Sequence, residues 1–273
     1  MGPITKSSSS SPRARMVSFF ASLFNDVLKS PYVMELHSRK SQGYRNRVSG
    51  EFREAESGIL FTSDVSARGV DYPGVTHVVQ FGMPSSRDQY VHRLGRTGRA
   101  GADGKGWLVI GPFESPFLEE LKQINVPMDI ALTDALRDAA EDENHEGLMR
   151  VLMDKVGSGG DQNLAKSGEA AYQAFLGYYL GQMKRMRMDK KESLVDTANE
   201  FSAAMGFRRP PTLGKNMVGK MGLKGVSGIF VEDSSRGGDA GRGSNKAQPP
   251  PLRRERTRMD ATKPKPNQRP SRK

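Results

Sequence analysis

Residues 58–94 read GILFTSDVSARGVDYPGVTHVVQFGMPSSRDQYVHRL, and this stretch decides the fold class. Its apolar segments at 58–62 and 76–81 have the length and the residue types of buried strands. A helical pattern follows at 86–94. Strands that alternate with helices of about ten residues predict βαβ crossovers and therefore a parallel sheet. The stretch thus predicts an α/β protein with a doubly wound parallel sheet.

The alternation continues on both sides of this stretch. On the N-terminal side the patterns predict a helix at 16–29, a strand at 32–37 and a helix at 42–54, and on the C-terminal side a strand at 106–110 and a helix at 116–123. After Pro127 the strand patterns stop, and helical periodicity follows at 129–155, 163–184 and 192–205. We therefore expect an α/β domain over 16–127 and an all-α extension over 128–207.

Positive charge is concentrated at the C-terminal end. The 273 residues carry a net charge of +11, but residues 208–273 alone hold 17 lysines and arginines against 5 aspartates and glutamates. The rest of the chain is close to neutral. Because residues 208–273 are also rich in proline, glycine and arginine, they bury too little apolar surface to offset the entropy of ordering, and we expect a disordered basic tail. Such a tail suits a polyanionic partner such as nucleic acid.

Composition excludes several classes of site. The sequence has no cysteine, which excludes disulfides and cysteine nucleophiles, and its four histidines are widely scattered. No apolar run approaches the ~18 residues that span a bilayer. We therefore expect neither a metal site nor association with a membrane.

The most informative motif is HRLGRTGR at 92–99. One interpretation is a solvated helical face on which arginines recur every three residues. Gly95 and Gly98 count against it, because each glycine costs a helix interior about 1 kcal/mol. A tight loop would instead bring several guanidinium groups to one place. Their planar donors suit phosphate oxygens and the charge that develops on a transferring phosphoryl group.

A second motif, TSDVSARGVD at 62–71, directly follows a predicted strand. The carboxyl ends of strands in open α/β sheets are where ligands bind. The hydroxyls, Arg68 and the backbone of Gly69 offer donors to phosphates, and Asp71 offers an acceptor to ribose hydroxyls. Since Tyr-Pro-Gly follows, Asp71 is equally well explained as a turn residue.

Both motifs resemble motifs V and VI of the DEAD-box RNA helicases, whose motif VI, H-R-x-G-R-T-G-R, is matched at every fixed position. A third segment, HSRKSQGYR at 37–45, resembles the family element H-G-x-x-x-Q-x-x-R, with Ser38 in place of the glycine. The three occur in family order over 16–127, which corresponds to the second RecA-like domain. The helical extension and basic tail further resemble the fungal mitochondrial DEAD-box proteins that assist intron splicing. That subgroup points to mitochondria, and the sequence leaves the compartment otherwise open.

The resemblance implies roles for individual residues. Arg96 and Arg99 would reach the γ-phosphate of ATP as the catalytic arginines. The other ATP-directed residues would be Asp71, at the ribose, and His92 and Arg93, at the interdomain interface. Asp64 and Arg68 would organise the motif V loop. Ser63 and Gly69 would approach the RNA backbone. Gln42 and Arg45 would link motif VI to the face that binds RNA.

Two other family motifs are absent from the sequence. It contains neither G-x-x-x-x-G-K-[ST], whose backbone and lysine hold phosphates, nor D-E-A-D, which holds Mg²⁺. The resemblance therefore implies that ATP and Mg²⁺ are held mainly by an N-terminal RecA-like domain. We expect the C-terminal portion of an ATP-dependent RNA helicase that does not turn over ATP alone. The alternative is a non-catalytic RNA-binding or RNA-chaperone fragment.

The start of the α/β domain departs from the family pattern. The family has a hydrophobic strand before the helix that we place at 16–29, whereas this chain has five serines at 7–11. Residues 1–15 hold almost no apolar side chains, so we expect them to be disordered. The family comparison further predicts that the first strand is missing and that its neighbours lack a pairing partner. Two explanations remain open: a truncated or mis-joined gene product, and a standalone module whose sheet a partner completes.

Overall fold

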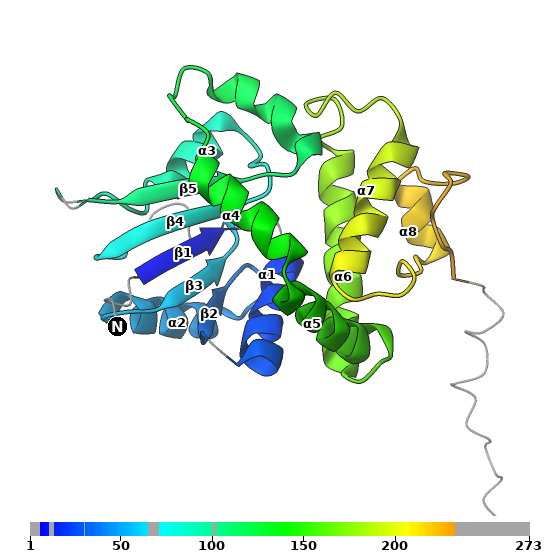
Figure 1. The fold of residues 1–273 in the computed structure, drawn as a ribbon, viewed down its shortest axis with the longest axis horizontal. Coiled ribbons are helices and arrows are strands. Elements are labelled where there is room, and N and C mark those ends of the chain that lie inside the picture. The colour runs from blue at the N-terminus through cyan, green and yellow to red at the C-terminus, as the bar shows by residue number, and fades with distance from the viewer. Residues whose placement is uncertain are drawn as a thin grey trace, which may run out of the picture. The chain divides into compact units, whose positions relative to one another are not determined.

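A five-stranded parallel sheet forms the centre of the fold in the computed structural model (Figure 1). The model describes residues 6–10, 14–29, 31–64, 71–99, 101 and 103–232. The strands are β1 Lys6–Ser10, β2 Val33–Leu36, β3 Ile59–Thr62, β4 Val75–Phe81 and β5 Lys105–Val109. They lie in the order β2-β3-β1-β4-β5, and every neighbouring pair is parallel. The doubly wound α/β sheet predicted from the sequence is confirmed.

The expectation of a missing first strand is wrong. The serine run forms β1, the central strand, which pairs with β3 from Ser7 opposite Ile59 to Ser10 opposite Thr62, and with β4 on its other side. A parallel ladder is built from backbone N–H and C=O groups, which serine supplies as well as valine does. A strand held by its backbone gives no signal in side-chain hydropathy, so the serine run does not look like a strand in the sequence. No gap in the sheet remains between β3 and β4.

Helices cover the two faces of the sheet. Helix α2, Gln42–Glu54, begins where the side chain of Ser41 accepts a hydrogen bond from the Tyr44 amide. Its buried Val48 and Phe52 pack in a cluster with residues of β2, β3 and β4. The remaining helices of the α/β part are α1 Ala14–Ser22, continued by the π-helical turns η1 Leu23–Leu28, then α3 Arg87–Leu94 and the 3₁₀ helix η3 Pro112–Leu121. Pro116 inside η3 removes a backbone donor, which disfavours a regular α-helix where one was expected.

The extension shares a core with the α/β part. Its helices are α4 Ile130–Glu141, α5 Glu143–Leu152, the π-helical η4 Met153–Gly157, α6 Gln162–Leu180, α7 Lys191–Ala204 and α8 Lys215–Lys220. Helix α6 packs against α1 and α7 (Figure 1). One cluster of buried side chains joins Phe19 of α1 and Phe117 of η3 to Leu176 and Leu194 of the extension. The extension is therefore part of the same folded unit.

The expected onset of disorder at residue 208 is also wrong. Residues 208–232 are folded, and Leu213, Val218 and Leu223 are buried against the extension. The glycine-rich, basic composition hid these three apolar anchors, which a local average of hydropathy dilutes. The disorder predicted for residues 233–273, and for residues 1–5 and 11–13, falls outside the described residues.

Replacing Gly206 by alanine is expected to lower the free energy of unfolding by about 2 kcal/mol or more. Gly206 follows α7 with a φ of 95°, and an added Cβ would lie 2.5 Å from the carbonyl oxygen of Leu152. The matched control is Gly147→Ala in α5, where nothing lies within 4 Å, and which should raise stability by about 1 kcal/mol. Urea unfolding of both variants measures the difference. Equal midpoints would contradict the packing described for this turn.

Candidate functional site

The carboxyl ends of β2 and β3 and the helix α3 meet at one edge of the sheet. There Arg93 of α3, only 1% exposed, forms an ion pair with Asp64: its Nε lies 2.7 Å and its Nη2 2.5 Å from the Oδ1 atom. The Nε2 of Gln89 donates to the same oxygen at 2.9 Å. Two residues of α3 thus hold the start of the 62–71 loop.

The end of α3 presents two arginines together. The helix ends at Leu94, and Gly98 has a φ of 65°, so residues 95–99 form a turn. The alternative of a continuous helical face is therefore wrong. In the turn, Nη1 of Arg99 lies 2.7 Å from Oδ1 of Asp71 and its Nε donates to the carbonyl oxygen of Gly95, while Nε of Arg96 donates to that of His92. Partial burial, followed by the nearby charge of Arg99, lowers the pKa of Arg96 below its ordinary value.

Asp71 fits both interpretations of its position. It lies two residues before Pro73 in the turn at Pro73 and Gly74, and its exposed carboxylate also pairs with Arg99. The sequence pattern left these two explanations open; the structure places Asp71 beside a turn, and its role at the ribose stays a prediction.

The remaining predicted residues lie in different surroundings. His92 is exposed on α3, and Gln42 is exposed on α2, where its Nε2 donates to Oδ1 of Asn46. Arg45 is half-buried, and its Nε has no hydrogen-bond partner within the described part of the chain. Ser63 is buried, and its amide donates to the carbonyl oxygen of Leu36. Arg68 and Gly69 fall outside the described residues.

The loop after β2 is anchored by His37, which is 2% exposed. Its Nε2 lies 2.8 Å from Oγ of Ser18 on α1, and its Nδ1 accepts from the amide of Arg39. Burial alone raises the pKa of Glu35, but hydrogen bonds from His37 and Lys40 more than offset it and hold that pKa below its usual value. The loop places Ser38, which replaces the family glycine, in an exposed position that tolerates a side chain.

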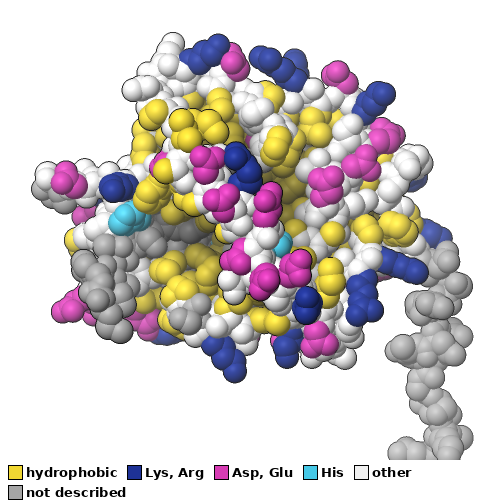
Figure 2. All heavy atoms as spheres, viewed as in Figure 1, with side chains coloured by type: hydrophobic (Ala, Val, Ile, Leu, Met, Phe, Trp, Pro, Cys, Tyr) yellow, Lys and Arg dark blue, Asp and Glu magenta, His cyan; other side chains and the backbone are white. Residues whose placement is uncertain are grey.

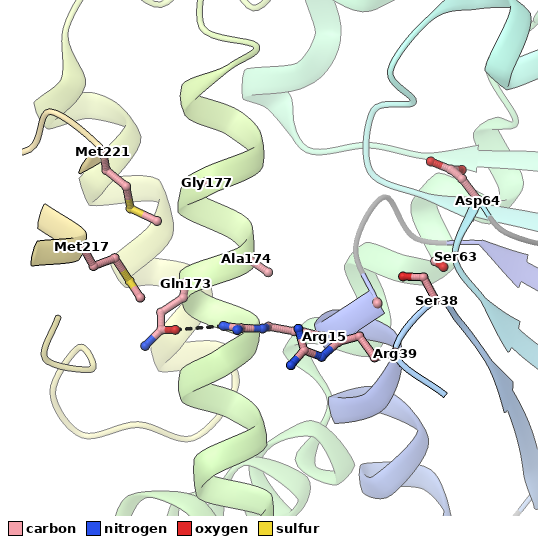
Figure 3. A pocket seen from close by; sticks show the side chains of 11 residues that line it. Arg15, Ser38, Arg39, Ser63, Asp64, Gln173, Ala174, Gly177, Met217 and Met221 are labelled. Carbon is pink, nitrogen blue, oxygen red and sulfur yellow. Dashed lines mark hydrogen bonds between the residues drawn. The ribbon is translucent and has the colours of Figure 1, made fainter. Parts of the chain in front are cut away.

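A groove of about 650 Å³ opens beside this edge of the sheet (Figure 3). One wall comes from the α/β part and the other from the extension; the lining residues are Ala14, Arg15, Ser38, Arg39, Ser63, Asp64, Gln173, Ala174, Gly177, Met217 and Met221. Nη1 of Arg15 donates to Oε1 of Gln173 across the groove at 2.9 Å. Two guanidinium groups and two serines therefore offer donors to an anionic ligand, and the methionines offer an apolar surface.

Sequence reasoning missed Arg15, Gln89 and Gln173. Arg15 and Gln173 are 158 positions apart and belong to no motif, so no local signal connects them. Gln89 lies three residues before the HRLGRTGR motif, and only its contact with Asp64 gives it a role.

Helices α4 and α5, unlike the groove, carry an acidic surface. Figure 2 shows acidic side chains gathered along these helices, and the exposed ones include Asp134, Asp138, Glu141, Glu143 and Glu146. A polyanion is repelled from such a face, so the groove lined by Arg15 and Arg39 is the better candidate for nucleic acid.

The described residues contain no group of three or more His, Cys, Asp or Glu side chains arranged to hold a metal ion. None of their helices combines the length and the apolar character required to cross a bilayer.

The sequence of this chain is similar to those of known proteins. The model of the helicase conserved C-terminal domain matches residues 8–101. DEAD-box ATP-dependent RNA helicase 25 of Arabidopsis thaliana is 49% identical over 199 residues, which are 73% of this chain and 32% of that protein. The mitochondrial ATP-dependent RNA helicase MSS116 of Phaeosphaeria nodorum is 43% identical over 222 residues, 80% of this chain and 37% of that protein. The chain spans about a third of the length of these relatives.

Solved structures share the fold. DEAD-box helicase Mss116 bound to single-stranded RNA and UDP-BeF superposes with a TM-score of 0.62 at 23% identity, covering 84% of this chain and 44% of that one. Domain 2 of Mss116p bound to an RNA duplex gives a TM-score of 0.57 at 24% identity, covering 84% and 87%. The match thus includes the extension as well as the sheet. The family model and the relatives show that this chain carries the helicase conserved C-terminal domain and is related to the DEAD-box RNA helicases over that part of their length, and the solved structures show that the shared fold continues into the helical extension.

Proposed function

We propose that this chain supplies the RNA-binding and arginine-finger half of an ATP-dependent RNA helicase. The observation that carries the proposal is the turn at 95–99, which sets Arg96 and Arg99 at the surface beside Asp71. In the proposed enzyme an N-terminal RecA-like domain holds ATP and Mg²⁺. Arg96 and Arg99 then reach the transferring phosphoryl group, and Asp71 reaches the ribose.

The Arg99–Asp71 pair is suited to such an exchange of partners. Its side chains are 37% and 70% exposed, and an ion pair of this kind is worth only about 0–1 kcal/mol. Arg99 therefore leaves Asp71 at little cost when a phosphate approaches, and the planar guanidinium then makes two charge-assisted hydrogen bonds. Arginine fingers act by stabilising charge in the transition state, not by binding the nucleotide. We accordingly expect no ATP turnover from this chain alone, with or without RNA.

For RNA, we propose that the backbone of a single strand lies in the groove of Figure 3. Arg15 and Arg39 contact phosphates, Ser38 and Ser63 donate to phosphate or ribose oxygens, and Met217 and Met221 pack against the bases. Gln42, Arg45, Arg68 and Gly69 keep the roles given by the family resemblance. The basic residues beyond 232 add affinity without sequence preference.

Binding of a fluorescein-labelled single-stranded oligouridylate, followed by anisotropy, tests the RNA part. Replacing Arg15 and Arg39 together by alanine is expected to weaken binding about 10-fold or more. The matched control replaces Arg137 and Arg150, which lie in exposed ion pairs on the acidic helices α4 and α5. Equal affinities of the two double variants would remove the groove from the proposal.

Salt dependence separates the groove from the tail. If about five phosphates are engaged, the slope of log K against log[salt] should be near −3.5, at ~0.7 per contact. Deleting residues 233–273, which hold 12 Lys and Arg against 4 Asp and Glu, should make the slope shallower by at least one contact. An affinity that does not change with salt would contradict electrostatic binding of RNA.

The non-catalytic alternative remains testable on the same protein. A chain that binds RNA, but that gives no ATP turnover when combined with the P-loop domain of a relative, would favour an RNA chaperone. For the compartment, the P. nodorum relative is named as mitochondrial, which supports a mitochondrial location here, and a fluorescent fusion expressed in the source cells would test it.

A further inference from the structure

The segment that leads into α3 is held by side chains from other elements. Both backbone polar groups of buried Met83 are engaged: its amide donates to Oε1 of Glu114 at 2.5 Å, and its carbonyl oxygen accepts from the hydroxyl of Tyr178 at 2.6 Å. Glu114 belongs to η3, whereas Tyr178 belongs to α6 in the extension. The start of α3 is therefore fixed in part from the extension.

Two more residues of the extension join these contacts. The hydroxyl of Tyr179 donates to Oε1 of Glu114 at 2.6 Å, and Glu114 is only 2% exposed. Burial, and then the negative charge of Glu114, raise the pKa of Tyr179, so its hydroxyl keeps the proton that it donates. Nη1 of Arg185 donates to the carbonyl oxygen of Ser85 at 2.9 Å, while its Nε and Nη2 make a bidentate pair with Glu120.

These contacts act on a short element. Helix α3 has 8 residues, so it is about 12 Å long, and the turn with Arg96 and Arg99 begins where it ends. Over such a length, a tilt at Ser86 moves the turn directly. Arg93, in the last turn of the helix, makes its ion pair with Asp64 only if the helix keeps its orientation.

We infer that the helical extension is a positioning element for the arginine turn. Tyr178 and Arg185, supported by Tyr179 and Glu114, set the start of α3, and α3 in turn sets Arg93, Arg96 and Arg99. These are positioning residues, because none of them lies at the proposed nucleotide contact. The consequence for ATP hydrolysis rests on the proposed function, whereas the effect of the extension on the orientation of α3 does not.

The test uses the full chain without RNA or nucleotide, so its outcome is independent of either binding activity. Tyr178→Phe leaves the Met83 carbonyl buried without a donor. Backbone amides of α3 should then exchange with deuterium about ten-fold faster, relative to those of α2, when followed by NMR. The matched control is Tyr172→Phe on the same helix: Tyr172 is equally buried, but its hydroxyl donates to Asn199 within the extension. That variant should change the ratio less than about two-fold.

The NMR signal of Arg93 distinguishes a change in the orientation of α3 from a general loss of stability. The Nε–H resonance of Arg93, hydrogen-bonded to Asp64, should shift in Tyr178→Phe and stay in place in Tyr172→Phe. Arg185→Lys keeps the positive charge but loses the bidentate geometry. Because Arg185 is partly exposed, this variant should stay folded even if Tyr178→Phe unfolds the protein. It should reproduce both effects. Equal responses to Tyr178→Phe and Tyr172→Phe, or an unmoved Arg93 signal in Tyr178→Phe and Arg185→Lys, would overturn the inference.

Discussion

Replacing Arg99 by alanine is expected to lower kcat for ATP hydrolysis about 10³-fold in a protein that joins this chain to the N-terminal domain of a DEAD-box relative. The arginine would stabilise charge that exists only in the transition state, so KM for ATP should change little. Affinity for RNA without ATP should also be unchanged, because Arg99 does not line the groove. Steady-state ATPase assays at saturating RNA measure the effect.

Two variants control this experiment. Arg137→Ala removes an arginine that is more exposed than Arg99 and likewise pairs with an aspartate, Asp134 on α4, and it should leave kcat within about two-fold of the parent. Arg99→Lys keeps the charge but not the planar fork, and should recover only a small part of the lost rate. Turnover that survives both Arg96→Ala and Arg99→Ala would refute the assignment of the turn to the nucleotide.

Asp64→Asn is expected to lower the free energy of unfolding by about 4 kcal/mol, the largest stability effect that we predict for a single side chain. The change leaves Arg93, whose side chain is completely buried, without its counter-charge. Nη1 of Arg93 already lacks a hydrogen-bond partner among the described residues. No second acceptor there can therefore replace the lost charge of Asp64.

The reverse substitution should be much milder. In Arg93→Met an apolar side chain of similar length fills the space, and the remaining carboxylate of Asp64 is 36% exposed and can be hydrated. We expect a loss of about 1 kcal/mol. Glu51→Gln, which breaks an exposed pair with Arg47 on α2, is the control and should cost under about 0.5 kcal/mol. Urea unfolding measures all three, and a larger loss in Arg93→Met than in Asp64→Asn would contradict the burial asymmetry.

Apolar periodicity and helix N-caps predicted the elements whose formation depends on residues close together in the sequence. β3, β4 and α2 were predictable because apolar residues recur with the period of each element, and Ser41 and Ser86 supply N-caps at the expected helix starts. β1 was not predictable in this way, since a central parallel strand depends on partners that lie 50 or more positions away and serine carries no hydropathy signal. Residues 208–232 were misjudged for a similar reason: three buried side chains outweigh a polar average.

The site shows the same division. Gly95 and Gly98 predicted the turn, because glycine disfavours a helix interior wherever it occurs. The three arginines, however, look equivalent in the sequence, and their environments differ: Arg93 is buried against Asp64, whereas Arg96 and Arg99 lie on the turn. Tertiary contacts make that distinction. The groove depends on tertiary contacts even more, since one wall comes from helices that carry no family motif.

The serine strand has a consequence for protein engineering. Strand β1 lies between β3 and β4 and pairs with both of them through its backbone. A free peptide in the same register could make the same backbone pairs, and β-branched residues would favour its extended conformation. The fold is thus a natural acceptor for strand complementation. A chain without its first 13 residues, paired with such a peptide, would give a two-part reporter whose assembly restores the sheet.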